Sequence, residues 1–283
     1  MRSKVRKIGA SMDREVTVLN LGAGVQSTWL RLNVPHDVAV YADTQQEPQW
    51  VYDHLAWLEH RGGPPILKVT AGDLGEGLIH GHNGKVASIP AFTAMVPGVK
   101  DGILQRQCTK AYKQRPIERA IRREVLGLPC RVRCRVPNGI MVNQLFGISA
   151  DEAGRAARIT ASIHPRWTRA CFPLLDRQMT RVDCERSLQP VIPHQVRRSS
   201  CIFCPFHSNA QWMELRAVEP SSWERAVEID RLLRMPGTAC NRAVTRKLYL
   251  HSSCQPLADL DFGAADVRQM SMFFMDCLGG CGN

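Results

Sequence analysis

A strand-length apolar run that ends in a glycine-rich turn constrains the fold of this chain more than any other feature. Residues 16–21 read Val-Thr-Val-Leu-Asn-Leu, which is apolar, β-branched and of strand length. Residues 22–27 follow as Gly-Ala-Gly-Val-Gln-Ser, and residues 27–33 have helix-like composition. A glycine turn between a strand and a helix N-terminus lets main-chain N–H groups approach an anion. The sequence therefore predicts a phosphate-binding loop, or otherwise a turn that serves packing alone.

The elements after this turn continue the alternation of strand and helix. A second buried strand is expected at 37–42, a helix at 48–60 and a third strand at 66–69. The order β-α-β-α-β predicts an α/β fold with a Rossmann-like, doubly wound and mostly parallel sheet. Ligands of such sheets bind beyond the carboxyl ends of the strands. Asp43 follows the second strand, so we expect it to lie close to the glycine turn.

The pattern changes at about residue 165, where short pieces and proline-rich joints replace the alternation. We expect a basic flexible arm at 1–14, a nucleotide-binding α/β domain at 15–164, and a smaller, mostly helical, cysteine-rich part at 165–283. The later elements expected are a loop at 73–103 with a hairpin at 86–93, a basic helix at 109–126, a strand at 140–148, and helices at 180–188, 209–218 and 221–234.

Positive charge is concentrated in one segment. The formal net charge is +11 and the isoelectric point is near 9.4. Residues 106–135 hold ten Lys and Arg residues, opposed only by Glu118 and Glu124. Either a surface for the phosphates of nucleic acid or a solvated helix face has this composition.

The compartment expected from the sequence is the cytoplasm. No apolar run approaches the length of a membrane span, and residues 1–14 lack the apolar core of a secretory signal. No membrane partner is therefore expected. In a reducing compartment, the eleven cysteines are ligands, redox groups or buried apolar residues rather than disulfides.

A second motif, Cys201-Ile-Phe-Cys204-Pro, brings two thiols to one turn. Two thiolates at this spacing converge on one metal, and the proline stiffens the turn. Arg197, Arg198 and His207 flank the motif, and their positive charge is expected to lower the thiol pKa values.

A four-coordinate metal site needs ligands beyond this pair. Cys108, at the start of the basic helix, is the natural third ligand, and Cys277 or Cys281 is a candidate fourth. A structural zinc site, a dithiol redox pair and a [4Fe–4S] cluster are all compatible with these residues, as are cysteines without a ligand role.

The glycine turn resembles S-G-G-x-D-S, the pyrophosphate loop of the N-type ATP pyrophosphatases and PAPS reductases. It has neither the lysine of a Walker A loop nor the third glycine of G-x-G-x-x-G. The chain resembles the PAPS reductase-like branch of the adenine nucleotide alpha-hydrolase (PP-loop) superfamily, with matching segments in the same order over residues 16–282. Within that branch it is most similar to a group of proteins with a Cys-x-x-Cys-Pro motif. The matching segments are 19–28, 42–44, 106–109, 115–117, 147–152, 172–176, 179–181, 200–207 and 277–282.

This resemblance implies an adenine nucleotide, ATP or alternatively PAPS or APS, bound with Mg²⁺ on the sheet rim. The residues it assigns to the nucleotide are Leu21, Gly22, Ala23, Gly24, Gln26, Ser27, Asp43 and Gly147. Those it assigns to catalysis are Ser27, Lys110 and Arg181. Gln26 stands where the family usually has aspartate, so the binding of Mg²⁺ departs from the family pattern. Asp151 and Glu152 are either Mg²⁺ ligands or helix-capping acids.

The resemblance also implies a reaction. Iron–sulfur members of the superfamily adenylate a carbonyl oxygen with ATP, release pyrophosphate, and let sulfur displace AMP from the activated carbon. A [4Fe–4S] cluster held by Cys108, Cys201 and Cys204 would leave one iron open for that sulfur, whereas a fourth ligand at Cys277 would close it. Zinc is the alternative metal.

The sequence thus predicts an ATP-dependent, iron–sulfur-dependent sulfurtransferase that thiolates or similarly modifies a nucleobase. Nucleic acid (tRNA or DNA) is its expected substrate, a sulfur-donor protein or sulfide its further partner, and a homodimer its expected assembly. One alternative is a sulfonucleotide reductase with Cys277 or Cys281 as nucleophile. Another is a non-catalytic, zinc-stabilised nucleic-acid-binding protein that keeps the loop as scaffold.

Overall fold

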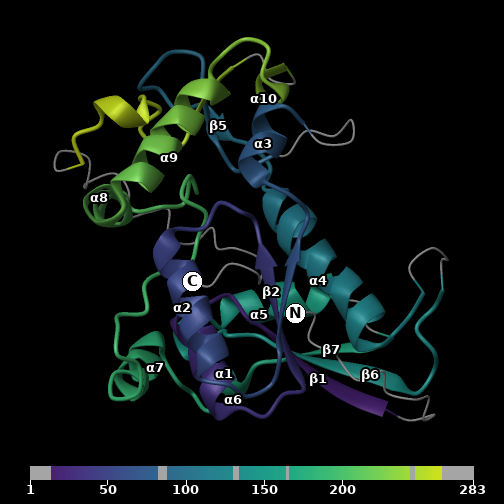
Figure 1. The fold of residues 1–283 in the computed structure, drawn as a ribbon. Coiled ribbons are helices and arrows are strands. Elements are labelled where there is room, and N and C mark those ends of the chain that lie inside the picture. The colour runs from purple at the N-terminus through teal and green to yellow at the C-terminus, as the bar shows by residue number, and fades with distance from the viewer. Residues whose placement is uncertain (1–13, 82–87, 130–133, 164–165, 243–245, 263–283) are drawn as a thin grey trace.

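The computed structural model describes residues 14–81, 88–129, 134–163, 166–242 and 246–262, and its centre is a parallel sheet (Figure 1). Five strands lie in the order β3-β2-β1-β6-β7, and every neighbouring pair is parallel. They are β1 (Arg14–Asn20), β2 (Val38–Asp43), β3 (Ile66–Thr70), β6 (Ile140–Leu145) and β7 (Thr168–Cys171). This arrangement confirms the predicted α/β fold with a Rossmann-like doubly wound sheet.

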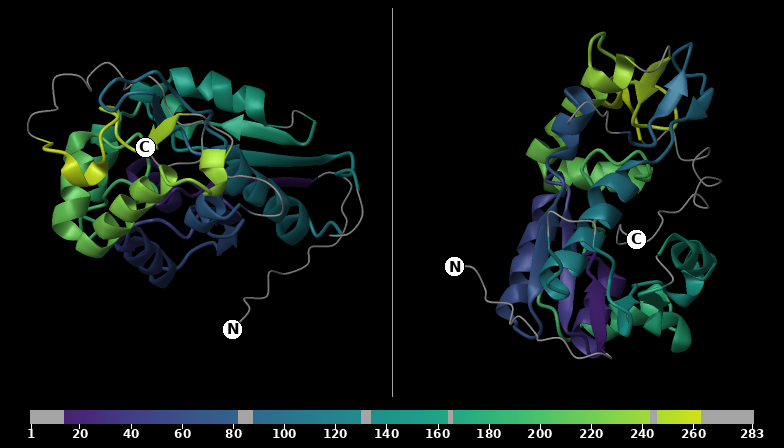
Figure 2. Two further views of the ribbon diagram at one scale, coloured as in Figure 1. Left: turned by 90° about the horizontal axis from the view of Figure 1, so that it is seen from above. Right: turned by 90° about the vertical axis from the view of Figure 1, so that its right-hand side faces the viewer.

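The order of the strands reverses at β1, which pairs with β2 on one side and with β6 on the other. Helices α1 (Val25–Asn33) and α2 (Gln49–His60) cover one face of the sheet. The basic helical segment, η1 (Thr109–Gln114) with α4 (Arg115–Ala120), and α5 (Gly154–Ser162) lie over the other face (Figure 2). Such a reversal is where doubly wound sheets bind ligands.

Side chains of β1 point alternately into two apolar cores. Leu19 packs with Leu30 of α1 and Leu55 of α2, whereas Val18 packs with Ile117 of α4. Leu19 and Val18 are both 0% exposed. Because both faces are covered, the inner strands read as continuous apolar runs rather than alternating ones, which is the pattern that predicted them.

Helix α2 begins where the sequence predicts, but a distant carboxylate caps its N-terminus. The N–H groups of Gln49 and Trp50 donate to the two carboxylate oxygens of Glu219, each over 2.9 Å. A carboxylate there satisfies unpaired N–H groups and favours the helix dipole. Glu219 joins α8 (Asn209–Val218) to α9 (Pro220–Leu233), so the cap fastens these later helices to the parallel sheet.

The basic helix predicted at 109–126 is one helical segment with π-helical turns at both ends. η1 leads into α4, and α4 leads into η2 (Ile121–Val125). Pro116 lies in the first turn of α4. Proline has no N–H, and its ring crowds the carbonyl group four residues earlier, so the wider turn before it keeps the segment continuous.

A second layer lies beyond the carboxyl ends of the parallel strands, at the top of Figure 1. It holds an antiparallel sheet in the order β5-β4-β8. Its elements are β4 (Phe92–Ala94), β5 (Gly102–Ile103), β8 (Lys247–Tyr249), α3 (Leu74–Ile79), α8, α9, α10 (Ala239–Arg242) and η4 (Leu257–Asp259). Below it, η3 (Ala150–Glu152), α6 (Pro173–Asp176) and α7 (Arg181–Leu188) complete the structure.

The prediction of a hairpin at 86–93 is wrong for the part that the structure describes, residues 88–93. Strand β4 begins at Phe92 and pairs with β5 and β8 instead. Phe92 lies directly opposite Tyr249, and both side chains are at most 1% exposed in one apolar cluster. Burial against this distant strand therefore sets the register. Segments from both sides of residue 164 share each sheet, since β7 extends the parallel sheet and β8 pairs with β4.

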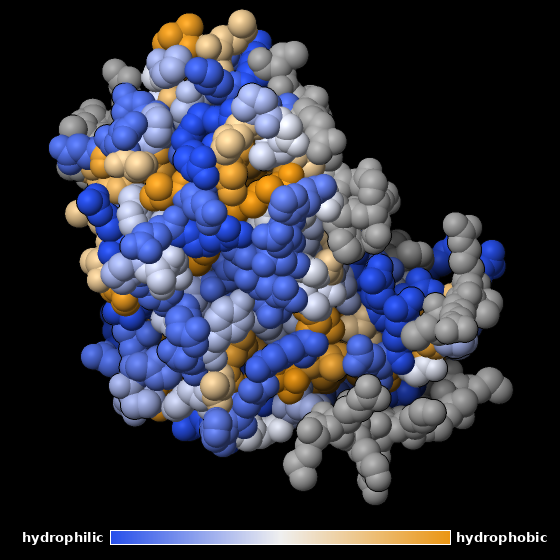
Figure 3. Space-filling view, turned by 45° about the horizontal axis from the view of Figure 1, so that its top comes forward, coloured by the Kyte–Doolittle hydropathy of each residue, from blue (hydrophilic) through white to orange (hydrophobic). Residues whose placement is uncertain are grey.

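The surface is mostly hydrophilic on the face drawn in Figure 3, with two hydrophobic patches. Over the ranges that the structure describes, no helix is both long and apolar enough to cross a membrane.

A buried histidine, His54, joins α1 and α2 through a hydrogen bond on one face of the sheet. The imidazole of His54 in α2 is 3% exposed, and its Nε2 lies 2.8 Å from Oγ1 of Thr28 in α1. Its Nδ1 lies 2.9 Å from Nε2 of His194. Burial, with a smaller contribution from repulsion by His194, lowers the pKa of His54 to about 4.

This shift predicts acid sensitivity. In the unfolded chain a histidine has a pKa near 6.5, so the unfolded state gains the proton first as pH falls. His54 should therefore cost roughly 3 kcal/mol of folding stability between about pH 7 and pH 4, because each pKa unit is about 1.36 kcal/mol. Urea unfolding across this range should show that loss in the wild type. His54→Gln should reduce it, whereas the exposed His60→Gln should not; equal pH dependence in all three would contradict the assignment.

Candidate functional site

The glycine turn closes on itself between β1 and α1. The N–H of Gly22 donates to Oγ of Ser27 over 3.2 Å, and that hydroxyl donates to the carbonyl of Gly24 over 3.1 Å. Ala23 adopts a positive φ of 57°, and Gly24 immediately precedes α1. Ser27 is 5% exposed, so its hydroxyl holds the turn together. Leu21 and Ala23 are also buried, which fixes the main chain of the loop against the sheet.

The loop after β6 lies against this turn. A Cβ atom added to Gly147 would lie 2.9 Å from the main-chain N of Ser27 and 3.1 Å from Cβ of Gln26. The first contact is with backbone, which cannot move aside as a flexible side chain can. The structure thus brings the predicted residues of 21–27 and Gly147 together at the strand-order reversal.

Gln26 joins the same loop through its side chain. Its Nε2 donates to Oγ of Ser149 over 3.3 Å and to Oε2 of Glu152 over 3.2 Å. Glu152 also forms an ion pair with the buried Arg155. An aspartate in place of Gln26 would set a second carboxylate against Glu152, whereas the amide donates to it. Oε1 of Gln26 is buried beside the turn, and no donor to it is found among the described residues.

The other predicted nucleotide and catalytic residues lie around this rim at different places. Asp43 accepts hydrogen bonds from the Tyr52 hydroxyl (3.0 Å) and the Gln45 N–H (2.7 Å) at the end of β2. Burial and Asp43 together raise the pKa of Tyr52, so the phenol stays protonated. Asp151 accepts from the N–H of Arg181, which makes it a capping acid for α7.

The structure separates the two predicted basic catalytic residues. The guanidinium of Arg181 pairs with Glu185 one turn along α7, at 2.9 Å. Lys110 is exposed and lines a pocket between α4 and α5 instead. No contact between either side chain and the glycine turn is found among the described residues.

Three of the four predicted metal ligands line one pocket. Cys108, Cys201 and Cys204 surround a space of about 20 Å³ together with Thr44, Arg106 and Lys113. The turn at 201–204 closes through the N–H of Cys204 to the carbonyl of Cys201, and the N–H of Ile202 donates to the carbonyl of Gln46 over 2.7 Å. The motif therefore docks on the segment that follows β2. We call this space the thiol pocket. Cys277 and Cys281 lie outside the described residues.

The thiols supply the right donors for a metal, but they are not gathered as ligands. Among the described residues, no three His, Cys, Asp or Glu side chains form a group that could hold a metal ion. None of the described cysteines forms a disulfide. The three thiols therefore share a pocket without forming a closed site, and the metal stays a prediction.

One buried carboxylate, which the sequence did not single out, organises the thiol pocket. Glu47 accepts from Nζ of Lys113 at 3.2 Å, and both side chains are at most 6% exposed. It also accepts from Oγ of Ser199 (3.4 Å) and Oγ1 of Thr44 (3.5 Å), while Sγ of Cys201 lies 3.8 Å away. Nothing in the spacing of these residues signals the pairing, because Lys113 and Glu47 are 66 positions apart.

The expected positive charge at His207 is absent. Burial, aided by repulsion from Arg198, lowers the pKa of His207 to about 3, so the ring is neutral at pH 7. Its Nε2 lies 2.7 Å from Oγ of Ser200. The prediction that His207 lowers the thiol pKa values by its charge is therefore wrong. Arg106 and Lys113 are cationic residues that line the pocket, and the guanidinium of Arg106 lies 4.8 Å from the centre of the Phe206 ring.

No protein-family model, no curated protein and no solved structure matches this chain. The resemblance described above therefore stays an interpretation of the sequence.

The contact of Gly147 with the turn yields a prediction. Gly147→Ala should destabilise the fold by about 1–3 kcal/mol, because overpacking forces backbone to shift. Gly154→Ala is the matched control: its added Cβ meets nothing within 4 Å at the start of α5, so stability should hold or rise slightly. Urea unfolding measures both. Equal stability of the two variants would refute the close approach.

The buried Lys113–Glu47 ion pair yields a further prediction about stability. Lys113→Met should lower the free energy of unfolding by about 3–5 kcal/mol, because it leaves a buried carboxylate without its counter-ion. Adding Glu47→Gln should recover part of that loss. A double-mutant cycle by urea unfolding measures the coupling energy of the pair. The exposed pair Lys68–Glu59 is the control, and its coupling energy should be about 0–1 kcal/mol. A buried coupling no larger than the control would contradict the role given to this pair.

Proposed function

We propose that this protein is an ATP-dependent transferase that adenylates a nucleobase carbonyl oxygen and releases pyrophosphate. Sulfur supplied as sulfide or by a donor protein then attacks the activated carbon from the thiol pocket, and AMP leaves. The observation that carries the proposal is the placement of two different sites on one sheet edge. The glycine turn follows β1, and the thiol pocket adjoins Thr44, which follows the neighbouring strand β2.

The glycine turn supports the nucleotide half of the proposal. Hydrogen bonds with Ser27 hold the main chain of the turn, and Gly147 packs closely against it. The N–H groups of the turn are therefore fixed before a ligand binds. Fixed donors stabilise the charge that develops on departing pyrophosphate without reorganisation. Gln26 adds a buried oxygen to which no described residue donates, and a bound nucleotide or its water could donate to it.

The thiol pocket supports the sulfur half. Thiolate is the nucleophilic and metal-binding form of cysteine, and nearby cations favour it. Lys113 and Arg106 line the pocket beside Cys108, Cys201 and Cys204. A [4Fe–4S] cluster bound to these thiols would supply an iron site for sulfur, and the protein's part would be to hold the three sulfur atoms and exclude water.

Anaerobic purification followed by metal analysis and an ATP assay tests this proposal. We expect about four irons per chain and pyrophosphate released from ATP in the presence of RNA or DNA. Cys201→Ser should lose the iron and slow transfer, whereas Cys134→Ser, outside the pocket, should keep both. Ser27→Ala should slow pyrophosphate release while iron is retained, because it breaks the turn rather than the pocket.

Two results would overturn the proposal. One zinc per chain with no pyrophosphate release would favour a nucleic-acid-binding protein. Sulfite released from PAPS or APS would favour a sulfonucleotide reductase.

A further inference from the structure

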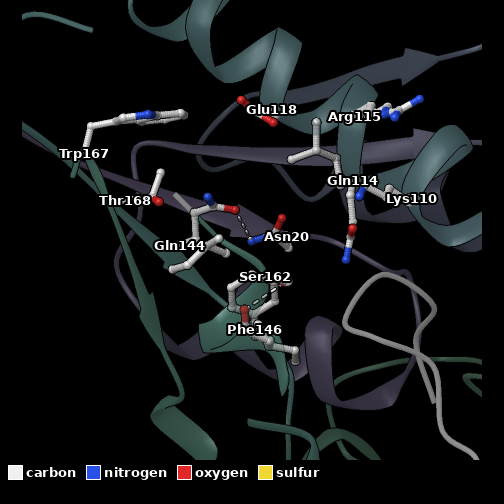
Figure 4. Close-up of a pocket in the computed structure, with 13 residues that line it drawn as sticks. Asn20, Lys110, Gln114, Arg115, Glu118, Gln144, Phe146, Ser162, Trp167 and Thr168 are labelled. Atoms are coloured by element: carbon white, nitrogen blue, oxygen red, sulfur yellow. Dashed lines mark hydrogen bonds between the residues drawn. The ribbon is translucent and has the colours of Figure 1, made fainter. Parts of the chain in front are cut away.

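A separate pocket, which shares no lining residue with the glycine turn or the thiol pocket, lies on the sheet face opposite α1 and α2. It occupies about 180 Å³ between α4 and α5, over the junction of β1, β6 and β7. Figure 4 shows Asn20 and Gln144 in its middle, with Trp167 and Glu118 on one side and Phe146 and Ser162 on the other. Pockets for drug-sized ligands are commonly 300–1,000 Å³, so this one suits a single ring system.

The centre of the pocket presents an amide donor and an amide acceptor side by side. Nδ2 of Asn20 donates to Oε1 of Gln144 and to the carbonyl of Leu145, both over 3.3 Å. That arrangement leaves the Gln144 amide N–H groups and the Asn20 carbonyl without a hydrogen-bond partner among the described residues. Gln144 is only 8% exposed, so these groups face the pocket rather than bulk water. Neither Nε2 of Gln144 nor Oδ1 of Asn20 is fully buried, so both can pair with the complementary edge of a ligand in the pocket.

The walls and the mouth of the pocket have the chemistry that surrounds a nucleic-acid base. Trp167 and Phe146, each 6% exposed, offer aromatic surface to a planar ring. Glu118 can accept from an exocyclic amino group. Lys110 and Arg115 are exposed where they line the pocket, so they can meet the phosphates on either side of an inserted base.

We propose that this pocket binds one unstacked base of a nucleic acid, with Asn20 and Gln144 on the base's hydrogen-bonding edge. The inference rests on the proposed function, because it assigns the pocket to the acceptor nucleobase. Extruding one nucleotide from its stack is how enzymes that modify bases reach the reacting atom. The pocket is separate from the glycine turn, which leaves that turn for the activating nucleotide.

Fluorescence anisotropy with a labelled single strand and with a matched abasic strand tests the pocket. The wild type should bind the strand with bases about tenfold more tightly, since amide contacts to one base and stacking each discriminate at about this level. Gln144→Met has similar length without the amide, so it should lose most of that preference and still bind the abasic strand. Arg115→Gln should weaken both strands alike. Gln189→Met, on the surface after α7, is the matched control.

A second measurement does not depend on a variant. A strand carrying a photoreactive halogenated base should crosslink to the peptides that contain Trp167 or Phe146 in the wild type. Equal affinity for both strands, or crosslinks only elsewhere, would overturn the proposal. Displacement of the strand by saturating ATP would assign the pocket to adenine and overturn it as well. If base preference persists while no pyrophosphate is released from ATP, the base pocket stands and the proposed transferase fails.

Discussion

The buried ion pair between Lys113 and Glu47 is the interaction on which the arrangement of the site depends. The pair joins the segment after β2 to the first turns of the basic helix, and further contacts of Glu47 reach Ser199 and Cys201. Taking two charges out of water is costly, so such a pair persists only where further donors satisfy the carboxylate. Ser199 and Thr44 are those donors. The network contacts Sγ of Cys201 through Thr44 and Glu47, while Cys201 and Cys108 also pack in the apolar cluster of the second layer.

Carboxylates from distant segments play the same part elsewhere around the rim. Glu219 caps the N-terminus of α2, Glu152 holds Gln26 and Arg155, and Asp151 caps α7. Glu219 and Asp151 accept from main-chain N–H groups at the starts of α2 and α7, which would otherwise lack partners, whereas Glu152 binds side chains of the glycine turn and of α5. Apolar contacts set the layers of this molecule, and these acids set the orientation of the groups between the layers.

The sequence predicted what local pattern determines. The β-α-β-α-β alternation and the helix at 209–218 are confirmed, because apolar periodicity and capping residues act within a few positions. It missed what depends on distant partners. Strand β4 is set by Tyr249, Glu47 by Lys113, and the neutral state of His207 by burial under the second layer. The glycine turn and the cysteines stood out as motifs, whereas the base pocket is built from Asn20 and Gln144, 124 residues apart and in no motif.

The basic helix connects the two proposed sites through its geometry. Thr109 and Lys113, one helical turn apart, line the thiol pocket, whereas Lys110 and Gln114, shifted by one residue, line the base pocket. Residues about one turn apart share a helix face, and a shift of one residue turns the side chain toward a different face. One turn of helix thus forms a wall of both pockets, with Cys108 immediately before it. Transfer of sulfur between the two proposed sites would require them to lie close together, and both are lined by residues of this one turn.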